Sequence, residues 1–443
     1  MSKLKAKTPK GMRDFLPAEM LKRQYVFGIV REVFESFGFE PISTPVMELR
    51  TTLMGNYGED AEKLIYHAQH TQGKEELALR YDLTVPLSRF FAEHENALSV
   101  PFRRYHIAPV WRGERPGRGR YREFTQCDAD IVGVRGVAAD AECLAVVYTA
   151  LTRLGFRAFQ VKLNHRGLLL SLAAYAGVPA AQQGGLYRII DKTDKIGLDG
   201  VAKELANEGL PDAVITALVD LLGYEAADNA EHLAHLRALL GQEAAPALDE
   251  LADLLRYTEA LGVPPGIIAL DLSMVRGLGY YTGPIYETII TEPENLGSVQ
   301  GGGRYDDLIG LFRFQSLPTT GISLGIERII DLMDQLDLYP PEVSGTVVQV
   351  MVAAFDSDTL PETLRLAHEL RAAGWRAEAY LDERKNFGKQ LGYAEGRGIP
   401  IVAMLGPDEL AAGQVTLRYL PTRDETTVPR ASISEQLRAW LAP

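Results

Sequence analysis

Seven arginines lie within one short stretch of an acidic chain. The stretch from 103 to 122 contains a single acid, Glu114, and its arginines are Arg103, Arg104, Arg112, Arg115, Arg118, Arg120 and Arg122. A guanidinium is a planar fork that matches phosphate oxygens, whereas a lysine ammonium is a point charge. The cluster therefore indicates a polyphosphate or nucleic-acid site, and a solvated basic surface is the alternative.

The composition limits the class of protein. The 443 residues carry a formal net charge of −13, but nucleic-acid binding depends on where the basic groups lie rather than on their sum. No apolar run approaches the roughly 20 residues that a membrane helix needs, and no apolar segment follows the N-terminal lysines, so we expect neither a membrane span nor a secretory signal. The only cysteines, Cys127 and Cys143, make no disulfide framework and favour a cytoplasmic location. Neither they nor the eight histidines have metal-ligand spacing, so we expect no metal held by a protein cluster.

The arginines require a scaffold, and the surrounding pattern predicts a hairpin. Residues 104–112 and 121–133 are strand-like runs, and the segment 114–120 between them contains one proline and two glycines. We therefore expect two long antiparallel strands that carry arginines at their tip. Helical spacing of apolar residues predicts helices over 18–37 and about 138–154, and alternation predicts a strand around 159–163.

The character of the chain changes twice after this region. Residues 165–262 are rich in Ala, Leu, Asp and Glu at helical spacing, which predicts a helical insertion within a first domain of 1–330. A Pro- and Gly-containing linker at 331–345 precedes a last domain at 346–443. Strand and helix patterns alternate in that last domain, which is typical of an α/β fold.

Four segments, taken in order, carry a resemblance to a known family. Residues 102–130 resemble motif 2 of the class II aminoacyl-tRNA synthetases, and 321–328 (GISLGIER) resemble motif 3. Between them, 275–283 (VRGLGYYTG) and 302–306 (GGRYD) are similar to the two segments specific to histidyl-tRNA synthetases. With smaller matches, such as 79–84 (LRYDLT), the resemblance covers nearly the whole chain.

This resemblance implies both an architecture and an activity. The expected fold is α/β: a class II catalytic domain with an antiparallel sheet flanked by helices, a helical insertion, and a C-terminal α/β anticodon-binding domain. The expected protein is a homodimeric histidine–tRNA ligase. It would activate histidine with ATP to histidyl-adenylate and pyrophosphate, then transfer histidine to the 3′ end of its tRNA, with Mg²⁺ accompanying ATP.

The chemistry of activation explains why arginines are needed. The substrate carboxylate that attacks the α-phosphorus is already an anion, so the reaction requires alignment and charge stabilisation rather than a general base. The resemblance assigns Arg112 and Arg276 as the catalytic pair at the α-phosphate. It also implies an ATP-binding set: Arg112, Glu114, Arg120, Phe124 and Arg328.

The resemblance also implies a histidine-binding set. Asp82, Thr84 and Gln126 match positions that hold the ammonium group, and Asp130 matches the position that accepts from the imidazole ring. The full set is Asp82, Thr84, Arg112, Gln126, Asp130, Arg276, Tyr280, Tyr281 and Tyr305. Side chains alternate along a strand, so residues 126, 128 and 130 should share one face.

Each feature alone also has a plain structural reading. Arg112 could form a surface salt bridge, Tyr280 and Tyr281 could be core aromatics, Gly301–Gly303 could form a turn, and Asp130 could cap a loop. Only the ordered conjunction of the four motifs argues against these readings. Gly279 stands where the family segment has aspartate. Two other functions stay open: a catalytically inactive synthetase-like regulatory subunit of histidine biosynthesis, and a class II synthetase of prolyl or threonyl specificity.

Overall fold

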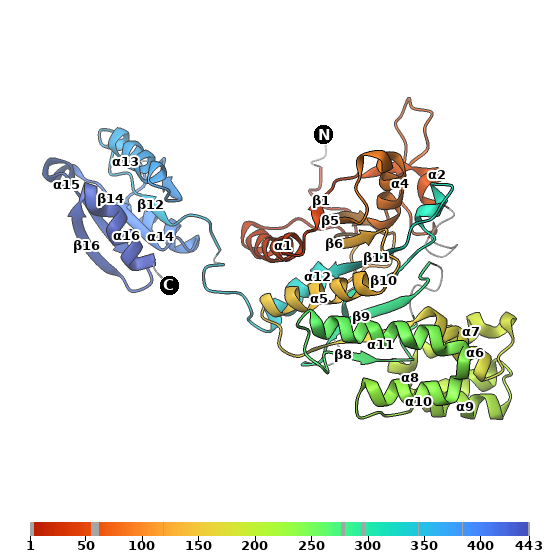
Figure 1. Cartoon of the computed structure of the whole chain (residues 1–443). Coiled ribbons are helices and arrows are strands. Elements are labelled where there is room, and N and C mark those ends of the chain that lie inside the picture. Colours follow the sequence, from red (N-terminus) through yellow and green to blue (C-terminus); the bar gives the residue numbers. More distant parts are fainter. Residues whose placement is uncertain are drawn as a thin grey trace. The chain divides into compact units, whose positions relative to one another are not determined.

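The chain divides into two compact units. A computed structural model describes residues 4–54, 62–117, 119–275, 280–293, 297–343, 345–382 and 384–441 (Figure 1). The first unit comprises Met1–Asp14 and Val26–Leu338, and the second comprises Phe15–Tyr25 and Tyr339–Pro443.

An eight-stranded sheet forms the centre of the first unit. Its strand order is β1-β5-β6-β11-β10-β9-β7-β8. The bounds are β1 (Glu40–Pro41), β5 (Phe102–Trp111), β6 (Glu123–Val132), β11 (Thr319–Gly325), β10 (Ser298–Arg304), β9 (Pro284–Ile290), β7 (Phe159–His165) and β8 (Ile268–Leu270). All neighbouring pairs are antiparallel except β1–β5 and β7–β8 at the two edges, which are parallel. The predicted antiparallel catalytic sheet is therefore confirmed.

The predicted arginine-bearing hairpin is the pair β5–β6. The strands align Phe102 with Val132 and Trp111 with Glu123, and the intervening segment forms the tip. Every residue of β6 from Gln126 to Val132 is buried because both faces of this strand are covered. The strand is thus a rigid central element on which polar side chains can be fixed.

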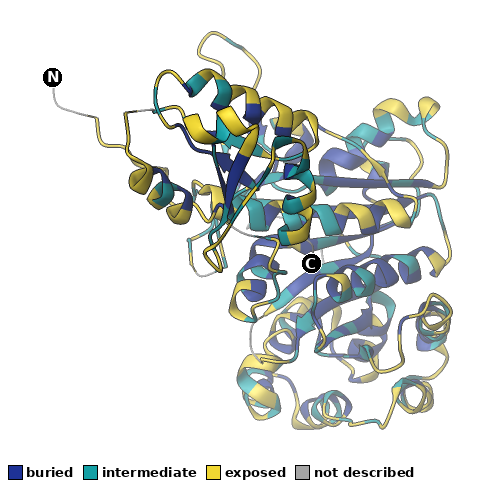
Figure 2. Cartoon of the chain, turned by 90° about the vertical axis from the view of Figure 1, so that its left-hand side faces the viewer, coloured by how far each residue is buried: buried dark blue, intermediate teal, exposed yellow. Residues whose placement is uncertain are grey.

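Helices cover the sheet. Helix α5 (Ala138–Arg153) packs against β11, β10 and β6, and α12 (Ile326–Gln335) packs against β6 and β10. Helix α1 (Pro17–Ser36) contributes buried Val26, Val30 and Val33 to the first unit. Gly38, with φ of 77°, follows α1, and this left-handed conformation suits glycine. Figure 2 shows buried strands between helices whose outer faces are exposed.

A small sheet and one helix precede the hairpin. The small sheet has the order β2 (Met47–Leu49), β4 (Leu77–Leu79) and β3 (His67–Ala68), and α2 (Arg50–Leu53) directly follows β2. Helix α4 (Thr84–His94) begins five residues after β4 and brings the segment 79–84 towards β5. Arg80 and Arg104 both donate hydrogen bonds across this junction, Arg80 to the Pro109 oxygen and Arg104 to the Leu83 oxygen.

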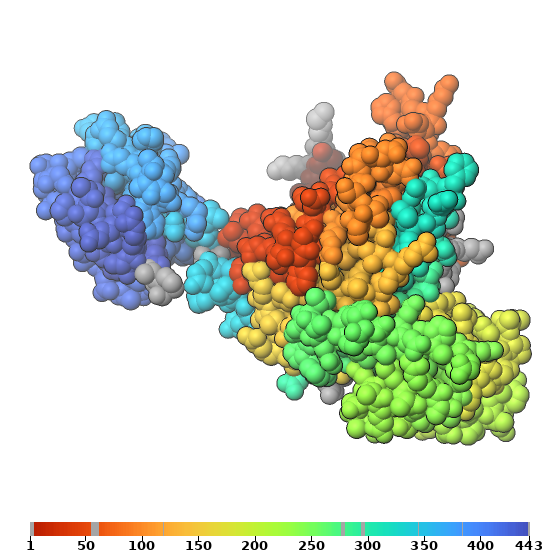
Figure 3. Space-filling view, in the orientation of Figure 1, coloured from red at the N-terminus to blue at the C-terminus, as the bar shows by residue number. Residues whose placement is uncertain are grey.

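The residues between β7 and β8, which lie in the stretch predicted as a helical insertion, form helices joined by short connections. Between β7 and β8 lie α6 (Arg166–Tyr175), α7 (Ala180–Ile190), α8 (Thr193–Asn207), α9 (Asp212–Leu222), α10 (Asn229–Leu240) and α11 (Ala245–Ala260). These helices bury a leucine-rich interior that includes Leu205, Leu218 and Leu236. Figure 3 shows them in yellow to green as a compact group within the first unit.

The second unit has its own five-stranded sheet, of order β13-β12-β14-β15-β16. Strands β12 (Val350–Val352), β13 (Ala377–Ala379) and β14 (Ile401–Met404) are parallel, whereas β15 (Gln414–Tyr419) and β16 (Asp424–Pro429) are antiparallel additions. Its helices are α13 (Leu360–Ala372), α14 (Phe387–Gly396), α15 (Pro407–Ala412) and α16 (Ile433–Leu441). The predicted α/β character is confirmed, and no helix within the described ranges is long and apolar enough to cross a membrane.

Candidate active site

Three adjacent strands build the floor of the candidate site. Gln126, Asp128 and Asp130 lie on one face of β6 and are 9%, 2% and 3% exposed. Their cross-strand partners on β5 are Ala108, His106 and Arg104, and their partners on β11 are Gly325, Ser323 and Gly321. The alternation predicted from the sequence therefore brings Gln126 and Asp130 to the same surface.

Asp130 is held by two neighbours. Its Oδ2 lies 2.6 Å from Nη2 of Arg104, a guanidinium that is fully buried, and the Tyr305 hydroxyl donates a hydrogen bond to its Oδ1. Burial raises the pKa of Asp130, and the Arg104 charge opposes that shift. A side chain at Gly321 would collide with this carboxyl group, so the close packing here requires glycine. Asp130 lies within a strand, so the reading that it caps a loop is wrong.

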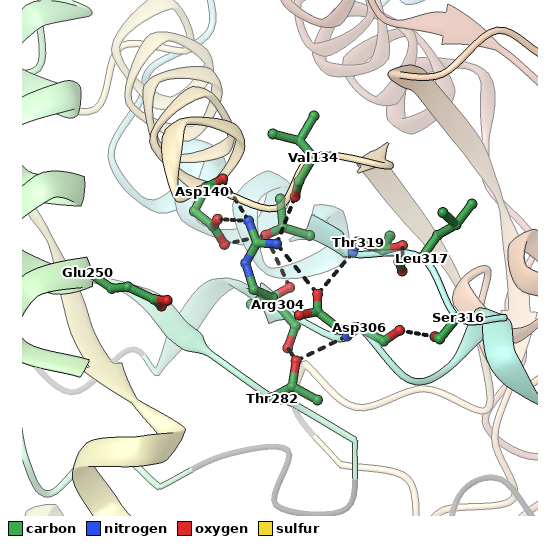
Figure 4. A network of polar contacts seen from close by, with 12 residues as sticks. Val134, Asp140, Glu250, Thr282, Arg304, Asp306, Ser316, Leu317 and Thr319 are labelled. Atoms are coloured by element: carbon green, nitrogen blue, oxygen red, sulfur yellow. Dashed lines mark hydrogen bonds and ion pairs between the residues drawn. The ribbon is translucent and has the colours of Figure 1, made fainter. Parts of the chain in front are cut away.

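The GGRYD segment is anchored by its arginine. Arg304 donates hydrogen bonds to the Val134 and Gly136 carbonyls at 2.9 and 3.0 Å and to the buried carboxylate of Asp140 (Figure 4). Asp306 accepts from the Thr319 amide at 3.1 Å, which ties the end of this segment to β11. The network fixes β10 so that Tyr305 reaches Asp130.

The three consecutive glycines lie inside β10, so the reading that they form a turn is wrong. A Cβ on Gly303 would lie 2.8 Å from the Pro284 carbonyl and 2.8 Å from the Tyr281 ring. The glycines therefore permit close approach of neighbouring strands and of Tyr281. The ring centroid of Tyr280 lies 4.3 Å from that of Tyr281 and 6.3 Å from that of Tyr305, so the three tyrosines form one cluster.

Asp82 and Thr84 lie at the beginning of α4. Asp82 Oδ1 accepts hydrogen bonds from the Thr84 and Val85 amides at 3.0 and 3.1 Å. The Asp82 charge also raises the pKa values of Asp128 and Asp130, although burial is the larger cause for both. The structure thus brings Asp82 into electrostatic contact with the β6 carboxyl groups.

Arg112 lies between two aromatic rings. Its guanidinium carbon is 4.4 Å from the Tyr81 ring centroid and 5.1 Å from that of Phe124, and its Nε donates to the Tyr81 carbonyl at 3.1 Å. Among the residues that the structure describes, no carboxylate forms an ion pair with Arg112, so the salt-bridge reading is not supported. Glu114 is half-buried and Arg120 is exposed on the hairpin segment that follows Arg112.

The motif 3 helix meets that hairpin. Arg328 donates to the Ser298 carbonyl, and its Nε would lie 3.8 Å from a Cβ at Gly119, next to Arg120. The preceding residue, Glu327, pairs with Arg13 and accepts from the Thr125 amide at 3.3 Å. These contacts place Arg328 beside the arginine-bearing tip.

Some predicted site residues lie outside the described ranges or have other partners, and some residues of the site were not predicted from the sequence. Arg276 and Gly279 lie outside the described residues, as does Arg118. Two members of the arginine cluster serve ion pairs instead of an open phosphate site: Arg104 pairs with Asp130, and Arg103 pairs with Glu142. Asp128 could have been found from strand alternation, whereas nothing in the sequence distinguishes Arg104 or Ser323.

Comparison with known proteins gives a consistent result. The histidyl-tRNA synthetase family model matches residues 11–329, and an anticodon-binding domain model matches 349–440. A histidine–tRNA ligase of Cytophaga hutchinsonii is 39% identical, with 96% of this chain and 97% of the relative covered. That of Gloeobacter violaceus is 40% identical over 97% and 98%, and that of Aeropyrum pernix is 41% identical over 95% of both chains.

A solved structure agrees with the sequence matches. The crystal structure of histidyl-tRNA synthetase from Nostoc sp. PCC 7120 superposes with a TM-score of 0.87 at 31% identity, covering 99% of this chain and 100% of that one. The β5–β6 hairpin, the glycine strand and the motif 3 helix therefore occur in a chain that matches the family over almost its full length. From the fold, the motifs and these matches together, the chain belongs to the histidyl-tRNA synthetase family.

Proposed function

We propose that this chain is a histidine–tRNA ligase, which forms histidyl-adenylate and pyrophosphate from histidine and ATP and then transfers histidine to tRNA. One observation carries the proposal: β6 bears buried acceptors at Gln126 and Asp130, and the Arg112 guanidinium, directly after β5, lies against the Phe124 ring of β6. Acceptors suit the ammonium and ring N–H groups of histidine, and a guanidinium suits its carboxylate and the α-phosphate.

For histidine, we assign the ammonium group to Asp82, Thr84 and Gln126. The imidazole would then lie deeper along β6 against Asp130, whose Oδ2 lies beside Arg104 but makes no hydrogen bond among the described residues. The cluster of Tyr280, Tyr281 and Tyr305 would enclose the ring. Because a carboxylate accepts only, Asp130 selects a side chain that offers an N–H donor.

For ATP, we assign Phe124 to stack on adenine and Glu114 to accept from its amine. Arg120 and Arg328 would hold the distal phosphates, and the Arg328 Nε lies 3.8 Å from the Cβ position of Gly119, the residue before Arg120, which supports this assignment. Arg112 and Arg276 would stabilise the charge at the α-phosphate as the histidine carboxylate attacks it. By family resemblance we expect Mg²⁺ to enter with ATP and to neutralise its phosphates.

For tRNA, we assign a cavity in the second unit. The cavity has a volume of about 340 Å³ and lies where the parallel strands β12 and β14 end, with Phe355 and Phe387 in its wall. Phe355 is 62% exposed, so its ring is accessible from solvent beside this cavity. An exposed ring beside an apolar cavity can stack an unpaired base. By family resemblance we also expect a homodimer in the cytoplasm.

Arg276→Ala tests the phosphate assignment. An arginine that acts on the α-phosphate in the transition state should lower kcat for histidine-dependent pyrophosphate exchange roughly 100-fold or more, while the KM for histidine changes little. Arg188→Ala removes an equal charge from an exposed residue of the helical insertion and is the control. A change confined to the KM for histidine would remove Arg276 from the phosphate site.

Phe355→Ala tests the tRNA assignment. Loss of one stacked base should raise the KM for tRNA about tenfold in the charging reaction, and pyrophosphate exchange should be unchanged. Leu381→Ala, an exposed apolar residue of the same unit, is the control. Equal KM values for tRNA in both variants would move the contact away from this cavity.

A further inference from the structure

Gln126 is buried with one end of its amide held and the other end unpartnered. Its Nε2 donates to the Ser323 hydroxyl oxygen at 3.0 Å, whereas its Oε1 has no hydrogen-bond partner among the residues described. The two ends of an amide have nearly the same shape and opposite hydrogen-bonding character. The group that holds one end therefore decides whether the other end presented to a ligand is an acceptor or a donor.

Ser323 is itself directed by a carboxyl group. It lies directly opposite Asp128 in the β6–β11 register, where facing side chains are about 5 Å apart. Asp128 is 2% exposed, and hydrogen bonding from Ser323 lowers the pKa of this carboxyl against the larger effect of burial. Above about pH 7, where Asp128 is ionised and its carboxylate accepts only, the Ser323 proton would point to Asp128 and leave a serine lone pair for the Gln126 NH₂.

We propose that Ser323 and Asp128 are positioning residues that hold the Gln126 amide with its oxygen towards the ammonium group of histidine. The proposal rests on the proposed function, because it takes Gln126 as a contact of the histidine ammonium. In the reversed orientation the NH₂ would face the ammonium, and two donors cannot pair. The two residues therefore set the affinity for the amino acid without touching it.

The proposed contact with the ammonium group also explains why the Gln126 Oε1 has no hydrogen-bond partner among the described residues. A buried acceptor without a partner is costly, and such groups are retained where a ligand supplies the donor. Asp82 lies within electrostatic reach of Asp128 and Asp130, and these charges reinforce the preference for a cation at the same place. Because the acceptor end of the Gln126 amide is fixed, it also sets the direction from which the ammonium group binds.

The experiment compares Ser323→Ala with Ser323→Thr. Removing the hydroxyl should raise the Kd of histidine, measured by calorimetry without ATP, and its KM in pyrophosphate exchange by about tenfold. The KM for ATP should stay within about twofold, and Ser323→Thr, which keeps the hydroxyl, should restore histidine binding. Thermal unfolding of each variant separates a loss of folding from a loss of affinity.

The same serine substitution in a Gln126→Glu variant tests amide orientation specifically. In Gln126→Glu, both ends of the side chain are acceptors, so adding Ser323→Ala should change histidine affinity by less than about twofold. Asp128→Asn, whose amide can offer NH₂ to Ser323, should weaken histidine binding more in the wild-type background than in Ser323→Ala, where only the loss of the Asp128 charge remains.

The outcomes distinguish this inference from the proposed function. If wild-type protein shows histidine-dependent exchange and Ser323→Ala leaves the histidine Kd unchanged, the positioning role is wrong and the ligase function stands. An equal loss from Ser323→Ala in the wild-type and Gln126→Glu backgrounds would also overturn the positioning role. If the wild-type protein binds no histidine, the assignment of the site itself fails.

Discussion

Asp130 occupies a buried ion pair as well as the position assigned to reading the imidazole ring. Its neighbour Arg104 is 0% exposed, so the carboxylate is the countercharge for a guanidinium that has no access to water. A buried pair of this kind gives little net stability, but removal of one partner leaves an uncompensated charge. A substitution at Asp130 should therefore affect binding and folding together.

Asp130→Asn is expected to raise the KM for histidine roughly tenfold to a hundredfold, because a hydrogen bond to a charged group contributes about 1.5–3 kcal/mol. It should also lower the free energy of unfolding by about 3 kcal/mol through Arg104. Steady-state exchange and urea unfolding measure the two effects. Glu48→Gln breaks another ion pair with a buried carboxylate, that with Arg89, whose two residues lie outside the histidine set, and is the control for stability alone. An unchanged histidine KM in Asp130→Asn would make Asp130 purely structural.

Asp128 and His106 face each other across β5 and β6 and should have opposite pH dependences. Burial raises the pKa of Asp128 from 3.8 to about 7, so its contribution to stability is complete below about pH 4 and is lost as the pH rises through 7. Burial, with the charges of Arg104 and Arg80, lowers the pKa of His106 from 6.5 to about 3. The contribution of His106 is therefore complete above pH 6.5 and is lost as the pH falls through 3.

The two contributions should partly cancel in the wild-type protein between about pH 4 and 6.5. Asp128→Asn removes the contribution to stability that decreases as the pH rises. The free energy of unfolding of this variant, relative to wild type, should therefore increase as the pH rises through this range. His106→Gln should show the reverse trend. Urea unfolding at several pH values measures both, and parallel curves for wild type and Asp128→Asn would contradict the burial-driven shift.

At the residue scale, the sequence predicted which side chains share a strand face better than it predicted what each side chain binds. Strand alternation was sufficient to place Gln126 and Asp130 on one face, because the side-chain period of a strand is fixed. It could not show that Arg104 is a buried partner rather than a phosphate ligand, since burial depends on strands distant in sequence. Ser323 gave no signal because its role exists only through its neighbours on β6, Gln126 and Asp128.

At the element scale, one side chain of the helical insertion closes an edge of the large sheet. Strand β8 is the last strand, and its outward-facing groups are bonded by Asn229 at the beginning of α10. The Asn229 Nδ2 donates to the Ile268 carbonyl at 2.7 Å, and its Oδ1 accepts from the Leu270 amide at 3.0 Å. The Asn229 side-chain amide thus satisfies the two backbone groups that a further strand would otherwise bind. This contact protects the sheet edge from pairing with a strand of another chain.

Asn229→Ala is expected to speed hydrogen exchange at the Leu270 amide and to lower the free energy of unfolding by about 1–2 kcal/mol, the contribution of two hydrogen bonds. Asn229→Asp keeps the acceptor for Leu270 and loses the donor to Ile268, so Leu270 should remain better protected than in the alanine variant. Equal protection of Leu270 in wild type and Asn229→Ala would show that the edge does not depend on this contact.

Elements with strong periodicity could be predicted, and weakly amphipathic ones could not. The β5–β6 hairpin and α5 lie close to their expected bounds because long runs repeat the same period. Strand β16 (Asp424–Pro429) has no buried residue, so it has no apolar alternation to detect, and only its pairing with β15 makes it a strand. The glycines of β10 have low strand propensity, and the close approach of Tyr281 and Pro284 explains their presence in a strand.

At the scale of the whole molecule, a net charge of −13 is compatible with nucleic-acid and ATP binding because the positive groups are local. Arg112, Arg120 and Arg328 lie around one hairpin, whereas acids are spread over the rest of the chain. Family membership follows from matches to both units, since the synthetase model covers 11–329 and the anticodon-binding model covers 349–440. A regulatory subunit without catalysis would need the same fold but not the same reaction.

Pyrophosphate exchange into ATP, measured with each of the twenty amino acids in turn, tests the central claim most directly. We predict exchange with histidine and Mg²⁺, and exchange at least about 100-fold weaker with any other amino acid, because a side chain without a ring N–H leaves Asp130 unpaired and the larger indole of tryptophan differs in shape from the imidazole ring. Comparable exchange with another amino acid would contradict the histidine assignment. No exchange with any amino acid, in a protein that still binds histidine, would contradict catalysis and indicate the regulatory function instead.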